Sequence, residues 1–152
     1  YNPSSSGQSK ITNTYIKEFQ TGISTWQENK IFGGGVKSFY YNCAKKSEVE
    51  QNLKGCSSHP HNYYVQISAE LGLFGLFLAI LLFSFIIFKS LKKILFYKEF
   101  GEKKMLLPFF ILFIVEIFPF KTTGSFFTTT NATYLFILIP FIIGLTELKK
   151  VK

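Results

Sequence analysis

The chain has 152 residues, of which 47% are hydrophobic and 18% aromatic, and its formal net charge is +8. Every basic residue is lysine. The lack of arginine disfavours a nucleic-acid-binding protein, because arginine makes most bidentate contacts to phosphate and guanine. The lysines gather instead beside long apolar segments, a pattern typical of a membrane protein rather than of a soluble domain.

The first 62 residues form a polar region that contains one amphipathic segment. Between about residues 11 and 29, apolar residues recur every three or four positions, which predicts a helix with one apolar face. That face consists of Ile11, Tyr15, Phe19, Ile23 and Trp26. We expect the helix to lie at a membrane surface, with charged residues such as Glu18 off the apolar stripe.

Three consecutive glycines, Gly33 to Gly35, follow this segment. The spacing of a nucleotide-binding loop, GxxxxGK[ST], is absent. The glycines therefore indicate either a plain turn or a loop that shapes a substrate cleft. The polar stretch 43–58 that comes next is expected to be mostly irregular.

Two cysteines, Cys43 and Cys56, bracket a polar interval of 12 residues. Outside the cytoplasm they could form a disulfide, which would stabilise the loop by roughly 3 kcal/mol, and the alternative is two reduced thiols. Together with His59 and His61 they are zinc-ligand types. The cysteines are much further apart than in the C-x2–4-C pairs of structural zinc sites, so we expect no metal site.

Three apolar segments predict membrane spans at residues 63–88, 105–120 and 131–148. The first contains 18 residues without charge, Leu71–Phe88, close to the length that a membrane helix requires. The second is interrupted by Pro108, Glu116 and Pro119. A carboxylate is costly in lipid, so Glu116 should face protein or water, most simply as a structural hydrogen-bond partner.

Lysine-rich segments beside the spans indicate which side is cytoplasmic. The sequence thus predicts an all-α polytopic membrane protein, with an extracytoplasmic loop and amphipathic helix followed by three transmembrane helices. The remaining segments are an extracytoplasmic region 1–62, a cytoplasmic loop 89–104, an extracytoplasmic turn 121–130 and a cytoplasmic tail 149–152.

His59 and His61 stand where the outer loop meets the first span. Histidine has an unperturbed pKa near neutrality and can accept a proton from a hydroxyl, although a structural role at a helix entrance is the alternative. Glu70 follows His61 by nine residues, about 13.5 Å along an unbroken helix, which is too far for direct contact. The chain contains no aspartate, so a Ser-His-Asp triad is excluded within it.

Three ordered elements of the sequence carry a resemblance to a known family. His61-Asn62, nine residues and Gly72-x-x-Gly75 resemble the H-[NSQ]-x9-G-x-x-[GTY] signature of the O-antigen ligase family. Trp26 with Ile31-Phe32-Gly33-Gly34-Gly35 is similar to its W…P-x-x-G-x-G element. The stretch 119–127, PFKTTGSFF, resembles its polar turn between late spans.

The resemblance implies a glycosyltransferase-type enzyme of the bacterial inner membrane, multi-pass, with its active site facing the periplasm. This chain would be its C-terminal portion and inactive alone. Members transfer a glycan from an undecaprenyl-pyrophosphate carrier to an acceptor hydroxyl in lipopolysaccharide or surface polysaccharide assembly, without a metal or other cofactor.

The implied partners are the carrier-linked glycan, lipid A-core or another glycan acceptor, and membrane lipids, but no nucleic acid. Alternatives are an O-antigen polymerase or a protein O-oligosaccharyltransferase of the same family. A non-catalytic membrane subunit that binds a lipid-linked glycan is a further alternative.

The resemblance assigns the essential histidine of the family to His61, as general base toward the acceptor hydroxyl. Asn62 would orient His61 and contact substrate, and further substrate contacts are expected from His59, Glu70 and Lys37. The motif glycines are Gly33, Gly35, Gly72 and Gly75. The family's arginines near the pyrophosphate have no counterpart here, so they would lie outside this sequence or be replaced by Lys37 and its neighbours.

Overall fold

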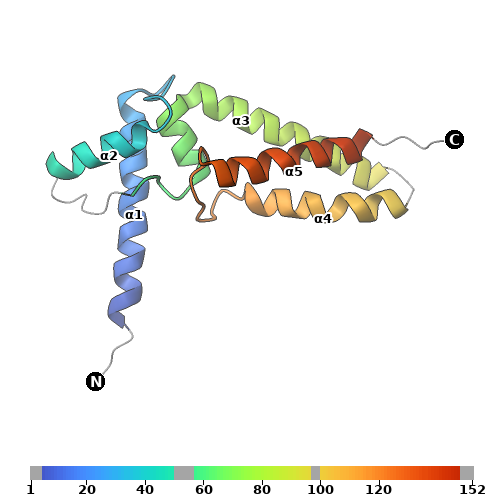
Figure 1. Ribbon diagram of the computed structural model, residues 1–152, viewed down its shortest axis with the longest axis horizontal. Helices are drawn as coiled ribbons and strands as arrows, with labels where there is room; N and C mark the ends of the chain where they lie inside the picture. Colours follow the sequence, from blue (N-terminus) through green and yellow to red (C-terminus); the bar gives the residue numbers. More distant parts are fainter. Residues whose placement is uncertain (1–4, 50–56, 97–99, 148–152) are drawn as a thin grey trace. The chain divides into compact units, whose positions relative to one another are not determined.

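The computed structural model describes residues 5–49, 57–96 and 100–147, and within them it contains five α-helices and no strand (Figure 1). The all-α prediction is therefore confirmed for the described residues. The helices are α1 (Ser5–Glu28), α2 (Ser38–Val49), α3 (Tyr63–Phe96), α4 (Phe100–Glu116) and α5 (Thr129–Glu147).

The chain divides into two compact units, and the boundary falls within α3. The first unit contains α1, α2, the start of α3 up to Phe77 and the turn Thr122–Thr128. The second contains the rest of α3, α4 and α5. All residues predicted to act on substrate lie in the first unit.

Among the described residues, two helices are long and apolar enough to cross a membrane, α3 with 34 residues and α5 with 19. The second of the three predicted spans, residues 105–120, is not confirmed. Its residues form α4, which has 17 residues, contains Pro108 and ends at Glu116 before Pro119. About 20 residues are needed to cross the hydrocarbon of a bilayer, so α4 is short for this task.

Aromatic packing holds the second unit together. The rings of Phe83 in α3 and Phe113 in α4 meet edge to face at 5.8 Å, and Phe109 of α4 stacks on Phe141 of α5 at 5.7 Å. Glu116 accepts a hydrogen bond from Lys121 Nζ at 2.7 Å, which is the structural partner expected for this carboxylate.

The amphipathic helix is confirmed as α1, but its protein-facing side is the polar one. The buried positions recur at helical spacing and are Glu18, Thr21, Gly22 and Thr25. The hydroxyls of Thr21 and Thr25 donate to the carbonyls four residues earlier, at 2.8 and 2.9 Å, so their burial leaves no donor unsatisfied. Tyr15, Phe19 and Ile23 of the apolar stripe are exposed, and the position of this helix at a membrane surface stays a prediction.

The expectation that residues 43–58 are mostly irregular is wrong in part, because α2 continues to Val49. Among the α2 residues whose burial is described, the buried hydrophobic side chains are Phe39 and Cys43, one turn apart. Two apolar positions are too few to produce a recognisable periodicity. Residues 50–56 lie outside the described part of the chain.

Gly72 interrupts α3 with a left-handed backbone (φ 68°, ψ −167°). The loop after α1 bonds to the backbone around this break on both sides. Gly34 N and Gly35 N donate to the carbonyls of Ala69 and Glu70, at 3.0 and 2.8 Å. Leu73 N and Phe74 N donate back to the carbonyls of Lys30 and Ile31, at 2.8 and 3.1 Å.

Two glycines make this backbone contact sterically feasible. A Cβ on Gly72 would lie 2.3 Å from the carbonyl oxygen of Ile31, and a Cβ on Gly33 would lie 2.4 Å from the carbonyl carbon of Glu70. Both residues also have positive φ angles. The loop 30–35, called the glycine loop below, is therefore more than a plain turn, because backbone hydrogen bonds join it to α3, the helix that follows the histidines.

We predict that Gly72→Ala destabilises the protein by more than about 1–2 kcal/mol, the cost of a left-handed alanine before any clash is counted. The measurement is the thermal midpoint of the purified membrane-embedded protein. Gly144→Ala is the matched control, because a Cβ there meets nothing within 4 Å. An equal midpoint for Gly72→Ala and Gly144→Ala would contradict the proposed role of the break.

Candidate functional site

The loop 57–62 presents His61 in an unusual backbone conformation. Its φ of 54° is left-handed, which is uncommon for a residue with a side chain. Two contacts fix it there. Thr123 N donates to the His61 carbonyl at 2.9 Å, and the Asn62 side-chain oxygen caps α3 by accepting from Tyr64 N and Val65 N at 3.0 and 3.2 Å.

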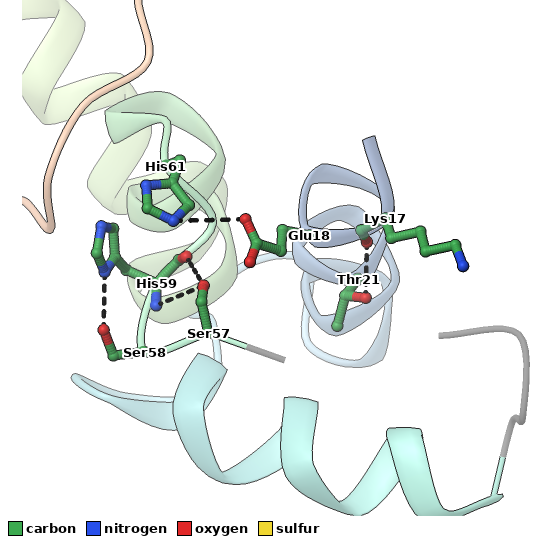
Figure 2. Close-up of polar contacts among 7 residues, drawn as sticks. All are labelled: Lys17, Glu18, Thr21, Ser57, Ser58, His59 and His61. Carbon is green, nitrogen blue, oxygen red and sulfur yellow. Dashed lines mark hydrogen bonds and ion pairs between the residues drawn. The ribbon is translucent and has the colours of Figure 1, made fainter. Parts of the chain in front are cut away.

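The ring of His61 pairs with a buried carboxylate on α1. Figure 2 shows Nε2 of His61 directed at Glu18, 3.4 Å from Oε2. The Glu18 side chain is 6% exposed and that of His61 is 29% exposed, so the carboxylate lies behind the ring and the ring reaches solvent. Tyr15, one turn before Glu18, meets the same ring edge to face at 5.2 Å.

Close contact between α1 and the histidine loop depends on Gly22. A Cβ at this position would lie 2.4 Å from Val65 Cγ1 and 3.2 Å from Pro60 Cβ. A larger residue would push α1 away from α3. Because Glu18 lies one turn from Gly22, a larger residue at position 22 would also move the Glu18 carboxylate relative to His61.

His59 lies beside His61, with 4.3 Å between the ring centroids. Its Nδ1 is 2.9 Å from the Ser58 hydroxyl, and the Ser57 hydroxyl donates to its carbonyl (Figure 2). Burial lowers the pKa of His59 below its usual value of 6.5 because it disfavours the charged ring. Charge on His61 lowers it further, and the backbone of Thr123 acts in the opposite direction.

Glu70 belongs to a second polar cluster in the same unit. It is 1% exposed and accepts hydrogen bonds from Lys37 N at 2.7 Å and from Gln66 Nε2 at 3.2 Å. Gln66 Nε2 also donates to Ser125 Oγ at 2.8 Å, and its Oε1 accepts from Phe126 N at 2.8 Å. The Gln66 side chain thus joins α3 to the turn 122–128, and Glu70 joins α3 to Lys37.

The predicted site residues therefore fall into two groups. His59 and His61 are in contact with each other, whereas Glu70 accepts a hydrogen bond from Lys37 N in the second cluster. Asn62 caps the helix, and its predicted substrate contact stays a prediction. Glu18 was missed, because a carboxylate off an apolar stripe normally faces solvent, and nothing in the sequence marks it as buried.

The cysteine and metal predictions concern residues that the structure describes only in part. Cys43 is buried in α2, while Cys56 lies outside the described residues, so the disulfide stays a prediction. Among the residues that are described, no three His, Cys, Asp or Glu side chains are grouped so that they could hold a metal ion.

Comparison with known protein families shows to which family the chain belongs. The family model described as O-antigen ligase matches residues 2–80, more than half of the chain. The chain belongs to the O-antigen ligase family. No curated protein and no solved structure matches it.

The part that matches the O-antigen ligase family includes α1, the glycine loop, the histidines and the break at Gly72, but not the turn 122–128. That turn nevertheless belongs to the same unit, where Thr123 N donates to the His61 carbonyl and Ser125 Oγ accepts from Gln66. Membership of the O-antigen ligase family, together with two apolar helices, identifies a membrane protein of polysaccharide assembly related to glycosyltransferases.

We predict that the stability of the protein falls as the pH is lowered through the usual histidine value of 6.5. The lowered pKa means that the folded state binds a proton on His59 less readily than the unfolded state, so acid favours unfolding. The thermal midpoint, measured between about pH 7.5 and 5.5, should therefore drop toward acid.

The control for this prediction is His59→Asn, whose amide can keep the hydrogen bond to Ser58 but does not titrate. The drop should be smaller in this variant. Identical pH profiles for the wild type and His59→Asn would show that another group is responsible.

Proposed function

We propose that this chain supplies the general base of a glycan transfer, from an undecaprenyl-pyrophosphate carrier to an acceptor hydroxyl on the periplasmic face of the inner membrane. The observation that carries the proposal is the pair formed by the solvent-accessible His61 ring and the enclosed Glu18 carboxylate. Family membership supports the glycan as substrate class.

The pair suits proton transfer for an electrostatic reason. With Nε2 directed at Glu18, Nδ1 is the ring nitrogen left to take the proton of the acceptor. The ring becomes positively charged as it does so, and a carboxylate behind it stabilises that charge and holds the ring orientation. Tyr15 limits rotation of the ring from the side.

In the proposed step the acceptor oxygen attacks the anomeric carbon of the carrier-linked sugar. The bond between that carbon and the pyrophosphate oxygen breaks, and the pyrophosphate carrier leaves with the bonding electrons. The proton of the acceptor hydroxyl moves to His61 Nδ1. Atoms and charge balance without a metal or a redox cofactor in this scheme.

The outer side of α1 supports a lipid-linked donor. A shallow apolar groove runs along it, lined among others by Tyr15, Ile16, Phe19 and Ile23. Tyr15 belongs both to this groove and to the surroundings of His61. A polyprenyl chain on this groove would bring its headgroup end toward the histidine.

We predict that His61→Ala in the full-length protein lowers glycan transfer by about 100-fold or more, within the usual contribution of a general base. Glu18→Gln should lower transfer by roughly 10- to 100-fold, as loss of a carboxylate partner does at other functional histidines. The measurement is the lipopolysaccharide ladder in a strain without its own ligase, followed by initial rates with purified protein.

Glu28→Gln is the control, since Glu28 lies on the same helix but is exposed. It should restore the ladder at wild-type level, with equal protein abundance in every variant. Full activity of His61→Ala would refute the catalytic role. No ladder from the wild type would direct the test to repeat-unit polymerisation, and lipid-linked glycan binding without any transfer would identify a non-catalytic subunit.

A further inference from the structure

A second cavity in the first unit is not used by the proposed proton transfer. It has a volume of about 300 Å³, and its lining includes Lys37, Tyr40, Tyr41, Ser58, Glu70 and Phe127. Sites for small molecules span about 300–1,000 Å³, so this one fits a single small ring rather than an extended chain. Its lining mixes aromatic rings with hydrogen-bonding groups.

We infer that this cavity binds one uncharged sugar ring of the glycan that is joined at His61, an inference that rests on the proposed function. Sugar rings present apolar C–H faces and hydroxyls that both donate and accept hydrogen bonds. The cavity offers partners for each of these features.

Two tyrosines provide exposed aromatic faces at the cavity. Tyr41 is 70% exposed and Tyr40 is 54% exposed, and their rings meet edge to face at 5.5 Å. Both belong to α2, and Phe127 contributes a further ring from the turn 122–128. Exposed aromatic residues beside hydrogen-bonding groups suit ligands with one apolar face.

Polar partners come from Glu70 and Lys37. A carboxylate has about four positions that can accept a hydrogen bond, and the two recorded bonds to Lys37 N and Gln66 leave further acceptor capacity. The Lys37 side chain lines the same cavity, and its ammonium group can donate hydrogen bonds. Sugar hydroxyls could therefore donate to Glu70 and accept from Lys37.

The charge of the lining argues against the pyrophosphate as occupant. One carboxylate and one ammonium sum to zero, whereas a pyrophosphate brings at least two negative charges into contact with buried Glu70. Like charges at short range and low solvent exposure are strongly unfavourable. Lys37 is accordingly assigned to a sugar and not to the anionic end of the carrier.

The cavity is also connected to the histidines. Ser58 lines the cavity, its hydroxyl is 2.9 Å from His59 Nδ1, and the His59 ring contacts the His61 ring. Ser58 and His59 therefore link the cavity to the proposed base. A sugar held there would place a neighbouring part of the same glycan beside His61.

The test is saturation-transfer NMR on the full-length protein in nanodiscs, with methyl α-D-glucopyranoside, methyl β-D-galactopyranoside and methyl N-acetyl-β-D-glucosaminide as probes. At least one neutral probe should receive signal. Tyr41→Ala should weaken its binding by about three- to tenfold, the effect of losing one aromatic contact. Tyr41→Phe should bind like the wild type.

Tyr134→Ala is the matched control, because Tyr134 is an exposed tyrosine of α5 that does not line the cavity. His61→Ala should bind the probe normally although it cannot transfer glycan, so failure of the base assignment and failure of the sugar site give different results. In a transfer assay with active protein, Tyr41→Ala should raise KM for one substrate only. A raised KM for the acceptor assigns the sugar to the acceptor, and a raised KM for the donor assigns it to the carrier-linked glycan.

Three results would overturn the inference. They are no signal from any neutral probe, equal binding by Tyr41→Ala and the wild type, and displacement of the neutral probe by inorganic pyrophosphate.

Discussion

The first unit depends on the reciprocal backbone hydrogen bonds between the glycine loop, residues 30–35, and the break in α3 at Gly72. A helix that is interrupted loses hydrogen bonds, and these are costly to leave unmade in an apolar setting. Here the loop 30–35 supplies partners on both sides of Gly72. The loop thereby holds Lys37 against Glu70, and it connects the end of α1 to the helix that begins just after His61.

Polar contacts, rather than a large apolar core, join the elements around the histidines. Glu18 faces His61, Gln66 binds the turn 122–128, and Thr123 holds the carbonyl of His61. Such networks are specific in geometry, because each donor needs an acceptor at a defined position. This arrangement explains how a histidine can be held in a left-handed conformation, which a loop with weaker support would relax.

The sequence was a good guide where a pattern is local and a poor one where a contact is distant. Length and hydropathy placed α3 and α5, and the periodicity of Tyr15, Phe19 and Ile23 placed α1. The motif spacing marked His61 and Gly72. The burial of Glu18 could not be predicted, because it depends on the close approach of Gly22 to Pro60 and Val65, residues about 40 positions away in the chain.

The orientation of α1 has a practical meaning for anyone who purifies this protein. The buried positions of α1 are a carboxylate, two threonines and a glycine, while Phe19 and Ile23 remain exposed. Little hydrophobic free energy then comes from docking the helix itself. If α1 lies at the membrane surface as predicted, lipid or detergent would cover its exposed apolar side chains. The choice of solubilising agent would then affect how α1 packs and how often Glu18 and His61 meet.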